Sequence, residues 1–156
     1  MTGRIALDPF DIAILRILQE DNTTPQRRIG EAVNLSAPAV QRRIKRMEKT
    51  GAIRGNFALL DPAKVGQPIT IFVEVEVESE QSEKIDALKR RFSSALEVQQ
   101  CYYVTGEADF ILILLVTDMA HYERLTRSLF FDSGNVRKFR TFIAMDNVKS
   151  TLTVPL

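Results

Sequence analysis

A cluster of cationic side chains is the part of this sequence whose residue types could bind a polyanion. Between Leu35 and Ile53, five arginines and lysines stand against one acid, Glu48, so the segment carries a net charge of +4. A helix stabilised by ion pairs along its own surface would need more balanced charges. The surplus therefore favours contact with phosphate groups; the alternative is a basic face that meets only water.

The same segment is typical of a single helix. Ser36 can accept a hydrogen bond from a free amide of the first turn, and Pro38 fits that turn because its missing N–H would have no partner there. Gly51 supplies the left-handed residue that often ends a helix. Apolar residues at helical spacing form a stripe that can pack on other helices. They are Val40, Ile44 and Met47.

Two more helices are predicted upstream. Asp8, followed by a proline, is typical of a helix start, and Asp11 is well placed against the positive end of that helix. Thr24 and Pro25 repeat the pattern for a second helix. Only residues 34–36 separate that helix from the basic one, so the two must cross steeply. The apolar residues expected in this core are Ile14, Leu15, Leu18, Ile29, Ala32, Val33 and Leu35.

Three helices, the last one basic and preceded by a tight turn, predict a helix-turn-helix with its third helix in the major groove of double-stranded DNA. Residues 52–61 alternate like a short strand and predict a β-wing that holds Arg54 beside the DNA. The residues expected to approach base edges are Ala37, Gln41, Arg42 and Lys45. Those expected to meet phosphates are Arg43, Arg46, Lys49 and Arg54, and Ser36 completes the predicted DNA-binding set.

Residues 61–68, which hold two prolines and a glycine, are predicted to link two domains. The first domain is the winged helix-turn-helix of residues 1–60, and the second covers residues 69–156. Charge divides near the same place, with +4 over residues 1–66 and −3 over residues 67–156. This distribution indicates polyanion binding by the first part and another task for the second.

The second domain reads as strand, helix, strand, strand, helix, strand. Strands are predicted at 69–78, 98–104, 110–116 and 136–148, and helices are predicted to follow caps at Ser82 and Asp118. This order is that of a ferredoxin-like α+β domain, an antiparallel sheet with both helices on one face. The helix residues expected to face the sheet are Ile85, Leu88, Phe92, Leu96, Tyr122, Leu125 and Leu129.

One face of such a sheet is left bare. The side chains expected there are apolar, so a second copy of the sheet is the predicted cover and a homodimer is expected. They are Phe72, Tyr102, Ile111, Ile113 and Leu115.

Several other classes of protein find little support. The 156 residues are 45% hydrophobic and 26% charged, as in an ordinary globular protein. Cys101 is the only cysteine, so no internal disulfide or multi-thiolate metal site can form. No apolar run reaches the length of a membrane span or a signal peptide, so a cytoplasmic location is expected. We expect no metal and no cofactor.

Catalytic residues are not predicted either. His121, the only histidine, is expected to be a surface residue rather than a general base, and Cys101 a small packed residue. No phosphate-binding loop or nucleophile elbow is present.

In the order and spacing of its motifs, the chain resembles the Lrp/AsnC (feast–famine) transcriptional regulators over nearly its whole length. The resemblance implies a DNA-binding regulator whose second domain responds to an amino acid and forms dimers that assemble into tetramers or octamers. The matching motifs are Leu7-Asp8-x-x-Asp11-x-x-Ile14-Leu15, the 36–53 helix, Leu60-Asp61-Pro62, Val104-Thr105-Gly106-x-x-Asp109, Val136-x-x-x-x-Thr141 and Val148-Lys149.

The resemblance also implies an amino acid effector held between dimers. The residues carried over are Thr105, Gly106 and Asp109, with Ser133, Gly134 and Thr141 as companions. Glycine permits close approach of a ligand, and a carboxylate can receive an α-ammonium group. The alternative is that Gly106 and Asp109 only build a turn. Ala108 and Phe139 depart from the family pattern, which leaves aromatic, branched and sulfur-containing ligands open, as well as none.

Two rival functions belong to other classes. Some proteins that resemble this family act on tetrapyrroles as enzymes. An architectural protein would instead compact DNA without an effector, with little preference for base sequence.

Overall fold

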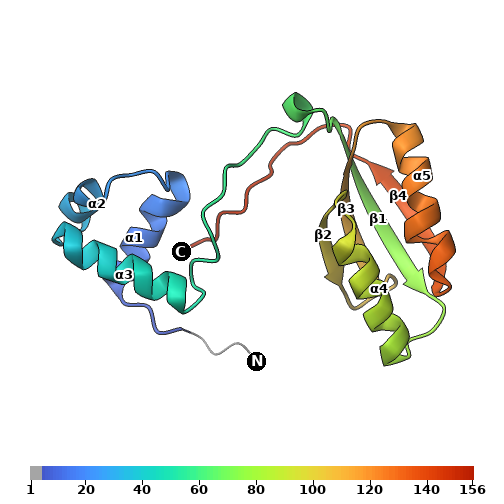
Figure 1. Cartoon of the computed structure of the whole chain (residues 1–156), viewed down its shortest axis with the longest axis horizontal. Coiled ribbons are helices and arrows are strands. Elements are labelled where there is room, and N and C mark those ends of the chain that lie inside the picture. Colours follow the sequence, from blue (N-terminus) through green and yellow to red (C-terminus); the bar gives the residue numbers. More distant parts are fainter. Residues whose placement is uncertain (1–4) are drawn as a thin grey trace. The chain divides into compact units, whose positions relative to one another are not determined.

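The structure, a computed structural model, describes residues 5–156 (Figure 1). Contacts divide the chain into two units. One unit holds the chain up to Ala58 together with Ser150–Leu156, and the other holds Leu59–Lys149. Among the described residues, no helix is both long enough and apolar enough to cross a membrane.

The first unit contains α1 (Pro9–Glu20), α2 (Gln26–Val33) and α3 (Ala37–Lys49). As predicted, Asp8 caps α1 and Ser36 caps α3, each side chain accepting a hydrogen bond from the first turn. Gly51 has a φ of 78°, the left-handed conformation expected just past α3. The core that joins the helices consists of Ile14, Leu15, Ile29, Val33, Val40 and Met47.

The start and the inner face of α2 differ from the prediction. Thr24 is not the cap: its hydroxyl donates to the carbonyl of Asp21, and Pro25, which has no N–H, takes the cap position. Ala32 is exposed, and Gly30 is buried instead. The reason is close packing at the turn, where Leu35 N–H donates to the carbonyl of Gly30 at 2.9 Å.

Gly30→Ala is expected to destabilise the helical unit. An added Cβ would lie 2.4 Å from the carbonyl oxygen of Leu35, so the backbone of the turn would have to move. Overpacking of this kind costs about 1–3 kcal/mol, and we expect a lower urea midpoint of unfolding and weaker DNA binding. Gly51→Asn is the control, because Gly51 has nothing within 4 Å and asparagine tolerates its conformation. Equal midpoints for the two variants would show that the turn is not closely packed.

The predicted β-wing is absent from the described chain. Residues 52–61 include no strand, and Phe57, Leu59 and Leu60 are exposed. An extended segment becomes a strand only when a neighbour accepts and donates its backbone hydrogen bonds, and the segment has no such strand partner among residues 5–156. The strand-like alternation of residues 52–61 therefore led to a wrong prediction of a wing.

The second unit has the predicted βαββαβ order. Its elements are β1 (Ile69–Val77), α4 (Ser82–Ser94), β2 (Val98–Tyr103), β3 (Phe110–Val116), α5 (Met119–Leu129) and β4 (Val136–Ile143). Short 3₁₀ turns, η1 (Ala63–Val65) and η2 (Phe131–Ser133), precede β1 and β4. The strand order is β2-β3-β1-β4 and every pair is antiparallel, which confirms the ferredoxin-like prediction.

Five boundaries in this unit differ from the prediction, and two of them, the ends of β1 at Val77 and of β2 at Tyr103, differ by one residue. Gln81, not Ser82, occupies the cap position of α4. Leu96 is 98% exposed because α4 ends at Ser94 and no longer directs that side chain inward. The last strand ends at Ile143 rather than at residue 148, since β1, its only neighbour, starts at Ile69.

Both helices cover the same face of the sheet. The alternating residues Ile71, Val73 and Val75 of β1 are fully buried and share one core with apolar residues of α4 and α5. On the other face, Phe72 stands between Ile113 of β3 and Phe142 of β4 in the strand register. That face is uncovered within one chain, as the sequence predicted.

Residues 150–156 belong to the first unit, whereas the sequence assigned them to the second domain. Gln19 of α1 holds their backbone through two hydrogen bonds. Its Oε1 accepts from Val154 N at 2.6 Å, and its Nε2 donates to Val154 O at 3.1 Å. Arg16 donates to the carbonyl of Leu156. The oxygen and the N–H of a glutamine amide can take the place of the backbone C=O and N–H of a neighbouring strand. Such a pairing depends on tertiary packing, so no local sequence pattern predicts it.

Candidate nucleic-acid interface and ligand site

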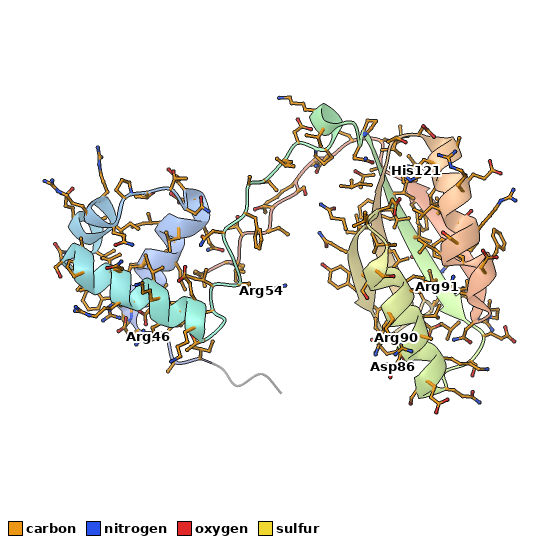
Figure 2. The ribbon with its side chains drawn as sticks, in the orientation of Figure 1. Arg46, Arg54, Asp86, Arg90, Arg91 and His121 are labelled. Atoms are coloured by element: carbon orange, nitrogen blue, oxygen red, sulfur yellow. The ribbon has the colours of Figure 1, made fainter. Side chains whose placement is uncertain are left out.

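The outward face of α3 carries the side chains that could meet DNA. Gln41, Arg42, Lys45 and Lys49 are exposed. Among the described residues, none of the three cations takes part in an ion pair within 4.0 Å. Arg54, on the chain that leaves α3, is exposed as well (Figure 2). Such cations keep their full charge for an external partner.

The other two cations of α3 are paired inside the protein. Arg43 Nη1 lies 2.6 Å from Asp8 Oδ2 and 2.8 Å from Asp11 Oδ1. Arg46 pairs with the second oxygen of Asp11, whose side chain is 0% exposed. The guanidinium of Arg43 also lies 5.3 Å from the ring centroid of Phe10.

These contacts change the ionisation of the partners in the expected directions. Hydrogen bonds to Asp8 and then to Asp11 raise the pKa of Arg43. The backbone N–H of Asp11, followed by the hydrogen bond from Arg43, lowers the pKa of Asp8. The two arginines therefore join α3 to α1, although the sequence predicted that they would meet phosphates.

Asp109 lies where two strands end. Its Oδ2 accepts a hydrogen bond from Val77 N at 2.7 Å, while its backbone N–H donates to the carbonyl oxygen of Val75 at 2.9 Å. Gly106 has a φ of 132°, which favours glycine, and Thr105 beside it is exposed. Asp109 and Gly106 thus both belong to the connection between β2 and β3.

The second predicted loop lies at the same end of the sheet. Ser133 Oγ donates to the carbonyl of Phe130 at 2.7 Å, and Gly134 is left-handed with a φ of 70°. Because β3 and β4 flank β1, this loop and the loop of Asp109 stand on either side of the end of β1. Thr141 does not join them. It is paired with Val73 in mid-sheet, and its hydroxyl lies 2.6 Å from that of Tyr122.

One polar residue at this end was missed. Asn135 is buried, its Oδ1 accepts from Ser79 N at 3.0 Å and its Nδ2 donates to Ser79 O at 3.1 Å. The signal that could have found it is an asparagine directly after a glycine, at the start of a strand.

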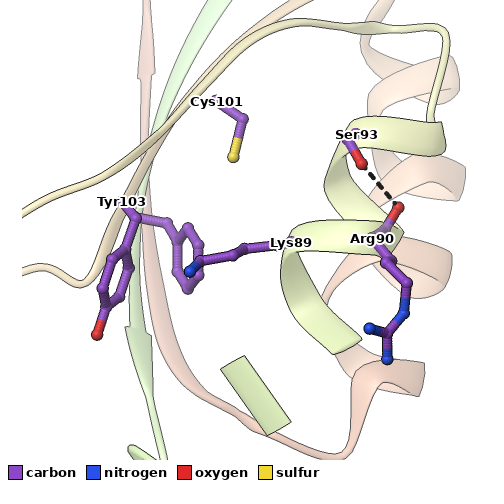
Figure 3. A pocket seen from close by; sticks show the side chains of 6 residues that line it. Lys89, Arg90, Ser93, Cys101 and Tyr103 are labelled. Carbon is purple, nitrogen blue, oxygen red and sulfur yellow. Dashed lines mark hydrogen bonds between the residues drawn. The ribbon is translucent and has the colours of Figure 1, made fainter. Parts of the chain in front are cut away.

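The second unit contains a pocket near α4 and another near β4. One of about 400 Å³ lies between α4 and β2, where the Lys89 ammonium is 4.8 Å from the ring centroid of Tyr103 (Figure 3). Cys101 lines it, and burial raises the pKa of its thiol, which agrees with a packed residue. The second, of about 350 Å³, lies beside β4 and is lined by Gly134, the only predicted ligand residue in either pocket.

His121 is half-buried rather than fully exposed. Its side chain is 22% exposed, and its Nε2 lies 3.1 Å from Glu97 Oε1. The start of α5 and the connection before β2 come together there, so the imidazole joins them. Within the described part of the chain, no group of three or more His, Cys, Asp or Glu residues could hold a metal ion.

Comparison with known proteins agrees with this geometry. The profile of the Lrp/AsnC ligand binding domain matches residues 70–154, and that of the AsnC-type helix-turn-helix domain matches residues 7–48. An uncharacterized HTH-type transcriptional regulator of Sinorhizobium fredii is 39% identical, covering 96% of this chain and 89% of its own.

Two solved structures are also similar. An AsnC family transcriptional regulator from Agrobacterium tumefaciens has a TM-score of 0.89 at 34% identity, covering 96% of this chain and 97% of its own. A transcriptional regulator of Neisseria meningitidis, solved as a complex with L-Met, has a TM-score of 0.89 at 27% identity with the same coverage.

Proposed function

Because the chain belongs to the Lrp/AsnC family of transcriptional regulators, we propose that it binds its DNA sites as a homodimer or larger assembly and that an amino acid modulates this binding. The family is one of regulators, which agrees with the expectation that the chain is not an enzyme. The exposed, unpaired cations of α3 carry the DNA-binding part of the proposal.

The proposed DNA contacts come from the free side chains of the first unit. The start of α3 enters the major groove, where Gln41, Arg42 and Lys45 meet base edges. Lys49 and Arg54 meet phosphates, and the capped start of α3 at Ser36 and Ala37 approaches the backbone. Arg43 and Arg46 are left out of this set because Asp8 and Asp11 already hold them.

A selection experiment tests this proposal. Duplexes selected from a random pool by the purified protein, and scrambled duplexes of equal composition, are titrated at several salt concentrations. We expect selected duplexes to bind at least about 10³-fold more tightly, as sequence-specific proteins do. They should contain imperfect palindromes with half-sites about 34 Å apart, because a dimer presents two copies of α3. Equal affinity for both duplexes would indicate the architectural rival.

The ligand part of the proposal is supported by the domain match and by the two loops at the end of β1. Asp109 uses Oδ2 to hold Val77 N, and among the described residues its other oxygen, Oδ1, accepts no hydrogen bond. We propose that this oxygen receives the α-ammonium group of an amino acid bound between dimers. The amino acid can shift the equilibrium between alternative assemblies only as far as its affinities for those assemblies differ.

Asp109→Asn is expected to weaken amino acid binding by about tenfold or more, because it removes a charge-assisted hydrogen bond. Unfolding midpoints should change little, since an amide oxygen can still accept from Val77. The readout is a thermal-shift screen with the twenty amino acids, in which a ligand of the folded form raises the melting temperature. Glu107→Gln is the matched control, an exposed acid of the same loop. An undiminished shift in Asp109→Asn would exclude the proposed role.

A further inference from the structure

The charge that α3 offers to DNA is smaller than its sequence indicates. Five cations belong to the basic segment, but Arg43 and Arg46 are bound by carboxylates of α1 and of the residue that caps it. Asp11 is the centre of this arrangement. Its Oδ1 accepts from Arg43 at 2.8 Å, and its Oδ2 accepts from Asp8 N at 3.0 Å and also from Arg46.

A carboxylate in this position competes with DNA phosphate for the same group. Arginine donates to carboxylates and phosphates through the same planar set of N–H groups. The side chain of Asp11 is 0% exposed, so it cannot itself touch the duplex. It acts only through the arginines that it holds.

The two arginines differ in how easily they could be released. Arg43 is 24% exposed, is also held by Asp8 at 2.6 Å and lies against Phe10, so it keeps partners if Asp11 loses its charge. Arg46 is 52% exposed and pairs with Asp11 alone among the described residues. It lies one helical turn from Arg42 and from Lys49, on the flank of the free cationic face, and is labelled on α3 in Figure 2.

We propose that Asp11 withholds Arg46 from the DNA backbone and thereby lowers both the affinity for DNA of any sequence and the salt dependence of that affinity. This inference rests on the proposed DNA binding through α3. Phosphate contacts strengthen binding to every sequence alike, whereas base contacts strengthen binding only to the correct one. Neutralising one arginine within the protein therefore lowers the affinity for specific and non-specific DNA by the same factor.

Asp11→Asn is the first test, with full-length protein and the selected and scrambled duplexes as probes. One released arginine that meets a phosphate should make the slope of log affinity against log salt steeper by about 0.9. At 0.1 M salt we expect affinity for the scrambled duplex to rise roughly three- to eightfold. Affinity for the selected duplex should rise by the same factor, because a phosphate contact strengthens binding to every sequence alike.

Two controls separate release of Arg46 from a simple change in charge. Glu48→Gln removes the same charge from the exposed face of α3, where Glu48 holds no arginine in the described chain, and should leave the slope unchanged. Asp11→Asn combined with Arg46→Gln should return the slope to the wild-type value. A steeper slope that persists in the double variant, or that Glu48→Gln reproduces, would overturn the proposal.

A third variant keeps the proposal testable even if Asp11→Asn fails to fold. Arg46→Gln alone removes an arginine that, on this proposal, does not meet DNA, so the wild-type slope should remain. A slope shallower by about 0.9 would mean that Arg46 already contacts phosphate, and the proposal would be wrong. Wild-type protein that binds neither duplex would instead refute the proposed function.

Discussion

Ile113→Asp is expected to leave the protein monomeric and to reduce its affinity for a DNA site with two half-sites by about 10²- to 10⁴-fold. Ile113 lies opposite Phe72 on the face of the sheet that no helix covers. A carboxylate at the centre of a packed interface loses its water without gaining a partner, which is strongly unfavourable. The large DNA effect follows because a monomer presents one copy of α3, and the gain from linking two copies is lost.

The uncovered face has the composition of an interface. Its centre is apolar and its flank toward β4 is ionic, with Arg140 Nη2 2.8 Å from Glu74 Oε2 and Lys138 Nζ 3.9 Å from Glu76 Oε1. The hydrogen bond from Arg137 lowers the pKa of Glu76, so that carboxylate stays charged. The apolar residues are Phe72, Tyr102, Ile111, Ile113, Leu115 and Phe142. An apolar centre with charged edges is what a second copy of the sheet would match.

Sedimentation velocity measures the first effect, and gel retardation on a selected duplex measures the second. Ala120→Asp serves as the matched control, since it places the same charge on an exposed position of α5. It should leave both the dimer and the DNA affinity unchanged. A stable dimer in the Ile113→Asp variant would exclude this face as the pairing surface.

Neighbouring arginines of α3 are expected to respond to substitution in opposite ways. Arg42→Ala should weaken binding to the selected duplex by about 5- to 150-fold, the range for loss of a good base contact, without changing the melting temperature. Arg42 is exposed and carries no ion pair among the described residues, so the folded protein loses nothing.

Arg43→Ala should instead destabilise the first unit. Removing this guanidinium leaves Asp8 without an ion-pair partner. Asp11, whose side chain is 0% exposed, then keeps only its ion pair with Arg46. A loss of only about 1 kcal/mol lowers the melting temperature of a domain of this size by roughly 4–8 °C, and we expect at least that shift. DNA affinity measured well below the transition should stay near that of wild type.

Thermal denaturation followed by circular dichroism and DNA titration of the same samples give both readouts. Lys45→Ala is the control for lost charge on α3, because Lys45 is exposed like Arg42. If Arg43→Ala kept its melting temperature and lost DNA affinity, Arg43 would be a phosphate contact as first predicted from the sequence.

Local patterns in the sequence determined most of the secondary structure. A helix start depends on residues within one turn, so Asp8, Ser36 and Asp118 were recognisable as caps without any tertiary information. The alternation of β1 likewise predicted which residues would face the helices. Where the local signal was shared by adjacent residues, as at Thr24 and Pro25 or Gln81 and Ser82, the helix start was displaced by one position.

Tertiary structure alone decided the partners of the polar residues. Asp11 and Arg43 are 32 positions apart, and Asp109 and Val77 are also 32 apart. Glu97 and His121 meet across 24 positions. Periodicity and capping signals extend over a few residues, so they specify the elements and the face that each element buries. Which charges pair depends on how those elements pack. This packing divides the five cations of α3 into two bound by acids and three that take part in no ion pair among the described residues.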